Sequence, residues 1–243
     1  MLMHVKMNRI TYSFTISHQH LLEFGLSFIT DFENQLPGPL QRIFQGLTSP
    51  FEVQSFLDSM PYLAVERDRS PLNVMLDEQC HCLDGGLLAV LALWRLGFRP
   101  LMIDLVPDPG ADDDHVLALY QVDGYWGAVA KSNYVNLGFR EPVHKTIREL
   151  VMTYFEHYCS VLQTKTLRGY TRPFDVSRFV HLDWALDEAG ANMLYYQYFY
   201  KRRPVPLFPA TLAAGFNRIS ERVYKAETLY TDLNWSFGVR PNH

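Results

Sequence analysis

The sequence predicts an α+β fold in which helices pack on an antiparallel sheet. Apolar and hydroxyl side chains alternate from Ile10 to Ile16, a period of two that is typical of a half-buried strand. An apolar run that begins at Cys82 and reaches Leu96 has the length of a buried helix. Further on, Asp123-Gly124 separates two apolar segments, which indicates a tight β-hairpin. With 243 residues and 48% hydrophobic composition, the chain can bury a sizeable core.

The N-terminal part begins with the strand over Ile10–Ile16. Apolar residues then recur with polar ones from His18 to Leu36, which predicts a helix that ends near Pro37-Gly38-Pro39. A second helix start lies at Ser49-Pro50-Phe51-Glu52, because Ser can cap, Pro suits the first helical position and Glu completes a capping box. This helix is expected to reach about Met60. Residues from about 65 to 79 are polar, and we expect them to be irregular.

The central part supplies the main helix and most of the sheet. The helix from Cys82 to about Leu96 is closed by Gly97, a favourable residue after a helix C-terminus. A strand is predicted over Arg99–Val106, followed by a turn-rich acidic loop and the hairpin around Asp123-Gly124. A second capping box, Thr146-Ile-Arg-Glu149, opens a helix with apolar residues at helical spacing up to Tyr158.

The composition changes near residue 165, where aromatic residues, Arg and Pro become frequent. Tyr195–Tyr200 is the densest aromatic cluster. We therefore predict a core over residues 1–163 and a mostly helical, aromatic-rich extension over residues 164–243 that packs on it. The short basic run Lys201-Arg202-Arg203 is interpreted as a solvated loop.

Charge and motif patterns exclude several classes of protein. The net charge of −4 and the lack of a long basic run give no support for a nucleic-acid or anionic-membrane partner. The N-terminal residues lack the apolar region of a secretion signal, and the longest apolar run is too short to span a membrane. Three cysteines argue against a disulfide framework, so we expect a cytoplasmic protein. Cys80-His81-Cys82 has no second ligand pair at zinc spacing, and neither a metal nor a cofactor is expected.

The candidate chemistry lies in Cys82 and His115. A free thiol has a pKa of about 8.5, and the N–H groups and dipole at a helix N-terminus favour its thiolate. The same N–H groups can stabilise an oxyanion. His115 opens the first hairpin strand and is the candidate general base. Gly85 and Gly86 weaken the first turn of the helix, which indicates a need for close backbone packing or for access there. The structural alternative is a buried, inert cysteine.

A third residue would have to orient the imidazole of His115, and the hairpin register gives two candidates. A two-residue loop would place Ser132 opposite His115, whereas a three-residue loop with a bulge would place Asn133 there. We favour Asn133, because an amide oxygen can accept the imidazole N–H, as in Cys-His-Asn enzymes.

Five segments together resemble an uncharacterised bacterial branch of the transglutaminase-like superfamily, part of the papain-like cysteine fold. They lie between about residues 75 and 165: Cys82-Leu-Asp-Gly-Gly-Leu, Asp112-Asp-Asp-His115, Trp126-Gly-Ala-Val-Ala-Lys-Ser-Asn133, Phe139-Arg-Glu-Pro and Arg148-Glu-Leu. The resemblance implies a papain-like core and acyl transfer through a thioester on Cys82, from a small-molecule or peptide substrate to water or an amine. The family carries Asp at the third position, where this chain has Ser132 or Asn133. The missing Asp motivates the alternative of a non-catalytic binding module.

Overall fold

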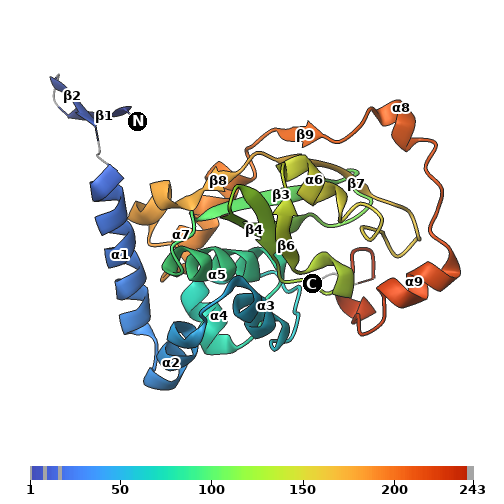
Figure 1. Ribbon diagram of the computed structural model, residues 1–243, viewed down its shortest axis with the longest axis horizontal. Coiled ribbons are helices and arrows are strands. Elements are labelled where there is room, and N and C mark those ends of the chain that lie inside the picture. The colour runs from blue at the N-terminus through green and yellow to red at the C-terminus, as the bar shows by residue number, and fades with distance from the viewer. Residues whose placement is uncertain (1, 8–9, 16–17, 240–243) are drawn as a thin grey trace.

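An antiparallel seven-stranded sheet, with helices on its faces, forms the centre of the computed structural model, which describes residues 2–7, 10–15 and 18–239 (Figure 1). The strands run in the order β6-β5-β4-β3-β7-β9, and β8 also pairs with β3. This confirms the predicted α+β class. The strands of this sheet are β3 (Leu101–Pro107), β4 (His115–Val122), β5 (Tyr125–Val129), β6 (Arg140–His144), β7 (Leu167–Thr171), β8 (Phe174–Asp175) and β9 (Pro204–Pro206).

The helices include most of those that the sequence predicts. The N-terminal ones are α1 (His18–Gln35), α2 (Gly38–Gly46), α3 (Pro50–Asp58), α4 (Pro71–Asp77) and α5 (Cys82–Arg95). The later ones are α6 (Ile147–Met152), α7 (Glu188–Met193), a π-helix (Leu194–Phe199), α8 (Ala210–Ala213) and α9 (Glu221–Glu227). Helix α6 ends earlier than predicted, and the expectation that residues 65–79 are irregular is wrong, because α4 begins there with Ser70 accepting the Asn73 N–H at 3.3 Å. Among the described residues, no helix combines the length and apolar character that a membrane span needs.

The predicted N-terminal strand belongs to a separate two-stranded sheet. Strand β2 (Ile10–Thr15) pairs with β1 (Leu2–Met7), and this hairpin lies at one end of the molecule, beyond the start of α1 (Figure 1). Ile16, the last residue of the predicted strand, lies outside the described residues.

Helix α5 is the buried centre of the helical layer. Leu87, Leu88 and Leu91 are fully or almost fully buried. The two glycines of its first turns allow this packing: a Cβ on Gly86 would lie 2.8 Å from Val116 Cγ1, and one on Gly85 would lie 2.6 Å from Lys131 Cβ. The two glycines therefore let the backbone of α5 pack closely against β4 and against the chain that follows β5.

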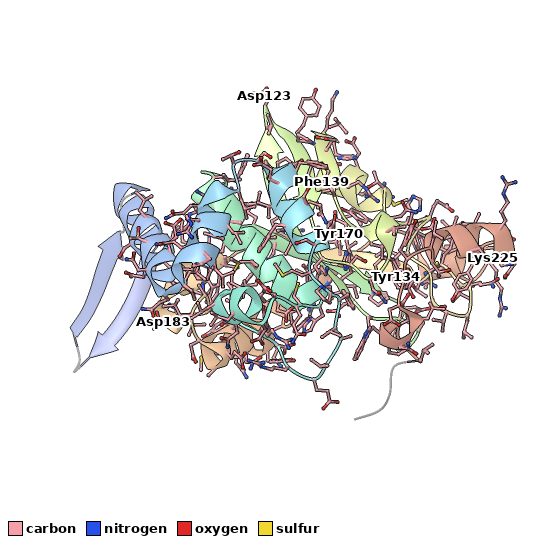
Figure 2. The ribbon with its side chains drawn as sticks, turned by 90° about the horizontal axis from the view of Figure 1, so that it is seen from below. Asp123, Tyr134, Phe139, Tyr170, Asp183 and Lys225 are labelled. Carbon is pink, nitrogen blue, oxygen red and sulfur yellow. The ribbon has the colours of Figure 1, made fainter. Side chains whose placement is uncertain are left out.

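The hairpin of β4 and β5 has a two-residue loop. Asp123 and Gly124 both have positive φ, 49° and 84°, as a type I′ turn requires, and Val122 pairs directly with Tyr125. Figure 2 shows Asp123 at the projecting tip. The favoured three-residue register, which would place Asn133 opposite His115, is therefore wrong.

The segment predicted as a mostly helical extension contains more helical than strand residues, and it also adds strands to the central sheet. Strands β7 and β8 pair with β3, and β9 pairs with β7. Trp184, Tyr195 and Phe199 are buried in the same core as α5. The predicted boundary at residues 163 and 164 thus falls within one sheet and beside one continuous core.

The two faces of the sheet carry different layers. On one face, Val116 and Ala118 of β4 pack with the residues of α5. On the other face, Leu117 and Leu119 pack with Tyr154 and with its neighbours after α6. Because side chains alternate along a strand, this parity also fixes the direction in which His115 points.

Candidate functional site

Cys82 is the first residue of α5, and His81 is the N-cap before it. The Nδ1 atom of His81 accepts the Leu83 N–H at 3.3 Å, and Asp84 Oδ1 accepts the His81 N–H at 2.7 Å. These reciprocal bonds form a capping box in which an imidazole takes the usual place of a hydroxyl. The thiol of Cys82 is half-buried, and its Sγ lies 3.8 Å from the carbonyl oxygen of Asp114.

The imidazole next to the thiol is that of His81. Its Nε2 lies 3.3 Å from Asp68 Oδ1, and the other oxygen of Asp68 accepts the Tyr196 hydroxyl at 2.6 Å. Burial alone would lower the pKa of His81, but Asp84, Asp68 and the Cys82 side chain together raise this pKa well above its usual value. An imidazolium at this position is therefore stabilised by two carboxylates.

The resting form of Cys82 is the protonated thiol. Burial raises the pKa of the Cys82 thiol, interaction with the His81 side chain lowers it, and Asp114 raises it again, with a net increase. Tyr62 also interacts with the thiol. Reaction at the sulfur therefore requires loss of the thiol proton, and the thiolate that results is stabilised by the His81 imidazolium beside it.

His115 lies on a different side of the sheet. It pairs with Leu105 of β3, and its Nε2 donates to the carbonyl oxygen of Leu137 at 2.8 Å. Its ring lies 6.5 Å from that of Tyr158, on the face opposite α5. Burial lowers the pKa of His115 to about 4, although the Leu137 carbonyl opposes this shift. The structure therefore does not direct the imidazole of His115 toward Cys82, and this imidazole is neutral at pH 7.

The two candidate orienting residues have other partners. Ser132 Oγ accepts the Tyr134 N–H at 2.9 Å. Asn133 holds the backbone of Asp232: its Nδ2 donates to the Asp232 carbonyl at 2.8 Å, and its Oδ1 accepts the Asp232 N–H at 3.2 Å. The amide of Asn133 is therefore engaged with Asp232, and β5 ends at Val129, before the chain reaches Ser132 or Asn133. The role of Ser132 toward His115 stays a prediction.

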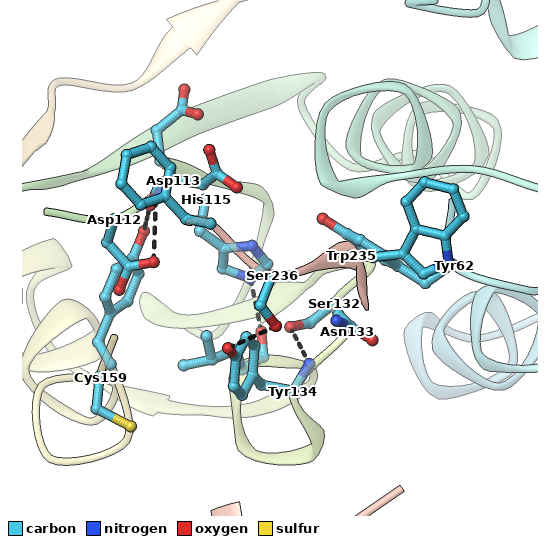
Figure 3. A pocket seen from close by; sticks show the side chains of 14 residues that line it. Tyr62, Asp112, Asp113, His115, Ser132, Asn133, Tyr134, Cys159, Trp235 and Ser236 are labelled. Atoms are coloured by element: carbon cyan, nitrogen blue, oxygen red, sulfur yellow. Dashed lines mark hydrogen bonds between the residues drawn. The ribbon is translucent and has the colours of Figure 1, made fainter. Parts of the chain in front are cut away.

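A small cavity of about 40 Å³ nevertheless brings His115, Ser132 and Asn133 together. The segment from Asp232 to Phe237 covers it, with Trp235, Ser236 and Phe237 in its wall and Tyr134 donating to Ser236 Oγ at 2.9 Å (Figure 3). Other lining residues, Tyr62 and Asp114, are the ones that interact with the Cys82 thiol. The cavity and the thiol thus share a wall.

Two carboxyl groups interact beside that wall, the buried Asp104 and the half-buried Asp114. Burial and the neighbouring Asp114 raise the pKa of Asp104 well above its usual value, and Asp114 also shares a side-chain hydrogen bond with Tyr200. A single proton between Asp104 and Asp114 avoids two buried negative charges at this position. Within the described ranges, no group of three or more His, Cys, Asp or Glu side chains is arranged to hold a metal ion.

Sequence reasoning missed His81 and Asp68. The signal for His81 was its position before an apolar helix with Asp84 three residues later, which is a capping pattern. No local pattern indicated Asp68, because it reaches His81 from an irregular segment.

Comparison with known proteins gives no family to which the chain can be assigned. No family model matches the sequence, and a search of curated proteins finds no significant match. The site is therefore defined by its geometry: a helix-capping imidazole beside a half-buried thiol, with a carboxylate behind the imidazole.

Proposed function

We propose that the protein is a cysteine-dependent acyl-transfer enzyme with Cys82 as its nucleophile. The observation that carries this proposal is the thiol at the first position of α5 with the His81 imidazole against it and Asp68 3.3 Å from His81 Nε2. Nucleophile, imidazole and orienting carboxylate are the three parts that thiol catalysis needs. In this proposal, His81 takes the place that the sequence assigned to His115.

The proposed reaction begins when Cys82 attacks the carbonyl carbon of an amide or ester. The thiol first loses its proton to solvent, because the raised pKa of His81 keeps this imidazole protonated, and the imidazolium stabilises the thiolate. The N-terminal N–H groups of α5 stabilise the oxyanion. The imidazolium then has Asp68 at 3.3 Å from one nitrogen and Asp84 at 3.6 Å from the other. It gives its proton to the departing amine or alcohol, and water or a second amine resolves the thioester on Cys82.

We extend the proposal to a transglutaminase-like, papain-like architecture. A cysteine at the start of a helix that packs on an antiparallel sheet supports it. The position of His115 on the other face of β4 is a departure from the expected arrangement. Three free cysteines support a cytoplasmic location, where thiols stay reduced.

Two observations favour the second candidate, a binding module without catalysis. The raised pKa of Cys82 keeps the thiol protonated, and the C-terminal segment covers the adjoining cavity. A structural thiol would have both properties.

The deciding experiment is iodoacetamide alkylation across a pH range, followed at each cysteine by mass spectrometry. The variant His81→Asn keeps a helix-capping acceptor but removes the imidazole, and His115→Gln is the matched control. We expect His81→Asn to slow Cys82 alkylation at least tenfold and His115→Gln to leave it unchanged. Cys80 and Cys159, both buried, are internal controls, since burial raises the pKa of Cys159 to about 12.

Turnover of amides and activated esters is then measured with Cys82→Ser as the control. Loss of turnover in Cys82→Ser and His81→Asn supports the enzyme. Alkylation of Cys82 that does not respond to His81→Asn contradicts the proposed role of His81. Alkylation no faster than that of Cys159 favours the binding module.

A further inference from the structure

A second cavity, which the proposed function does not use, lies at the opposite end of the sheet from Cys82. It encloses about 370 Å³ where β3 begins and β8 pairs with it, and its lining includes Leu101, Phe174 and Asp175. This volume lies within the range of about 300–1,000 Å³ that small-molecule sites usually have.

Three arginines from separate segments line this cavity. Arg99 precedes β3, Arg178 follows β8, and Arg202 follows the π-helix. Arg202 belongs to the run predicted to be a solvated loop, but its guanidinium lies over the Phe174 ring at 5.3 Å from the centroid. Its Nε is buried without a hydrogen-bond partner. Phe174 in turn stacks on Phe179 with ring centroids 5.0 Å apart.

The positive charge of the arginines is only partly neutralised. Asp175 is the one carboxylate in the lining, and its Oδ1 already accepts the N–H and hydroxyl of Ser177. Its Oδ2 lies 3.4 Å from Arg99. In the part of the chain that the structure describes, neither Arg178 nor Arg202 forms an ion pair. Guanidinium groups form charge-assisted hydrogen bonds with anions, so an anion in the cavity would neutralise the charge of Arg178 and Arg202.

The aromatic side chains in the lining favour a ligand that contains a planar ring. Phe179 and Trp126 contribute aromatic side chains to the same cavity as the arginines. Aromatic rings pack on such side chains with a preference for offset or edge-on contacts. Guanidinium groups bind phosphate with two parallel hydrogen bonds, and two uncompensated arginines match a dianion better than a monoanion.

We propose that this cavity binds a small aromatic phosphate, that is, a planar ring that carries a dianionic phosphate monoester. The phosphate contacts Arg178 and Arg202, and the ring lies against Phe179 and Trp126. This site is independent of the chemistry at Cys82.

The test uses phenylphosphonate, a non-hydrolysable aromatic dianion, with the full-length protein. Titration is followed by calorimetry and by tryptophan fluorescence at a pH well above the second pKa of phenylphosphonate, so that the probe is a dianion. We expect Arg178→Gln and Arg202→Met to weaken binding at least tenfold. Arg203→Gln, which removes an exposed neighbouring arginine outside the lining, is the matched control and should leave binding unchanged.

Three results would overturn the proposal. They are no binding of phenylphosphonate at millimolar concentration, equal binding by the Arg178→Gln variant and the wild type, and equal affinity for inorganic phosphate, which lacks the ring. Benzoate, an aromatic monoanion, should bind more weakly than phenylphosphonate, and equal affinity would contradict the dianion. Because Arg178 is exposed, its variant keeps the test decisive if Arg202→Met fails to fold.

Discussion

Replacement of His115 by Gln should make the protein markedly more resistant to mild acid. Burial lowers the pKa of His115 from 6.5 to about 4 in the native state. Below about pH 6.5 the unfolded chain therefore binds a proton at this residue and the native chain does not, so stability falls as pH falls. About pH 5 lies about 1.5 units below the unfolded value, and each unit corresponds to about 1.4 kcal/mol, so the wild type loses about 2 kcal/mol between about pH 7 and about pH 5 through His115.

The assay is urea unfolding of wild type and His115→Gln at both pH values. Gln retains an N–H donor for the Leu137 carbonyl, and all other titrating groups are common to both proteins. The difference in unfolding free energy between variant and wild type should therefore shift by about 2 kcal/mol in favour of the variant at the lower pH. A difference that is the same at both pH values would show that the pKa of His115 is the same in the folded and unfolded chains, and it would refute the buried neutral imidazole.

Three further predictions concern packing and the C-terminal segment. Gly86→Ala should destabilise the protein by about 1–3 kcal/mol in urea unfolding, because its Cβ would lie 2.8 Å from Val116 Cγ1. The control is Gly46→Ala, whose Cβ would have nothing within 4 Å, and equal destabilisation by both variants would contradict the clash. Lys131→Met should lower the free energy of unfolding by about 1–3 kcal/mol, since the buried amine donates to two carbonyls at the end of α3. An unchanged midpoint of urea unfolding would contradict this role. Asn133→Ala should speed hydrogen exchange over residues 232–237 by removing their backbone clamp; unchanged exchange there would show that other contacts hold the segment.

The elements that the sequence predicted well are those with a local physical cause. Asp123-Gly124 forms the two-residue turn because both residues adopt positive φ. Thr146 and Glu149 form their capping box, since the side chain of each accepts the backbone N–H of the other. Cys82 begins a helix as the apolar run and the closing Gly97 indicated.

The features that were missed depend on contacts between distant segments. Strand β7 is short and has no distinctive alternation, and it is fixed by pairing with β3. The direction of His115 depends on which face of β4 receives α5, which spacing along the chain does not reveal. Asn133 contacts Asp232, 99 residues away, so a register argument confined to the hairpin could not identify its partner.

The pairing of β3 with β7 and β8 has a consequence for the order in which the chain can fold. Strand β3 is buried almost throughout, yet the strands that pair with its second edge begin about 60 residues after β3 ends. While the chain is synthesised from the N-terminus, β4 can cover one edge of β3 early, but the other edge stays unpaired until residues 167–175 emerge. Unpaired apolar edges are sites of aggregation. Fragments that stop before residue 167 should therefore associate with one another, and the late strands protect the newly made sheet as well as extending it.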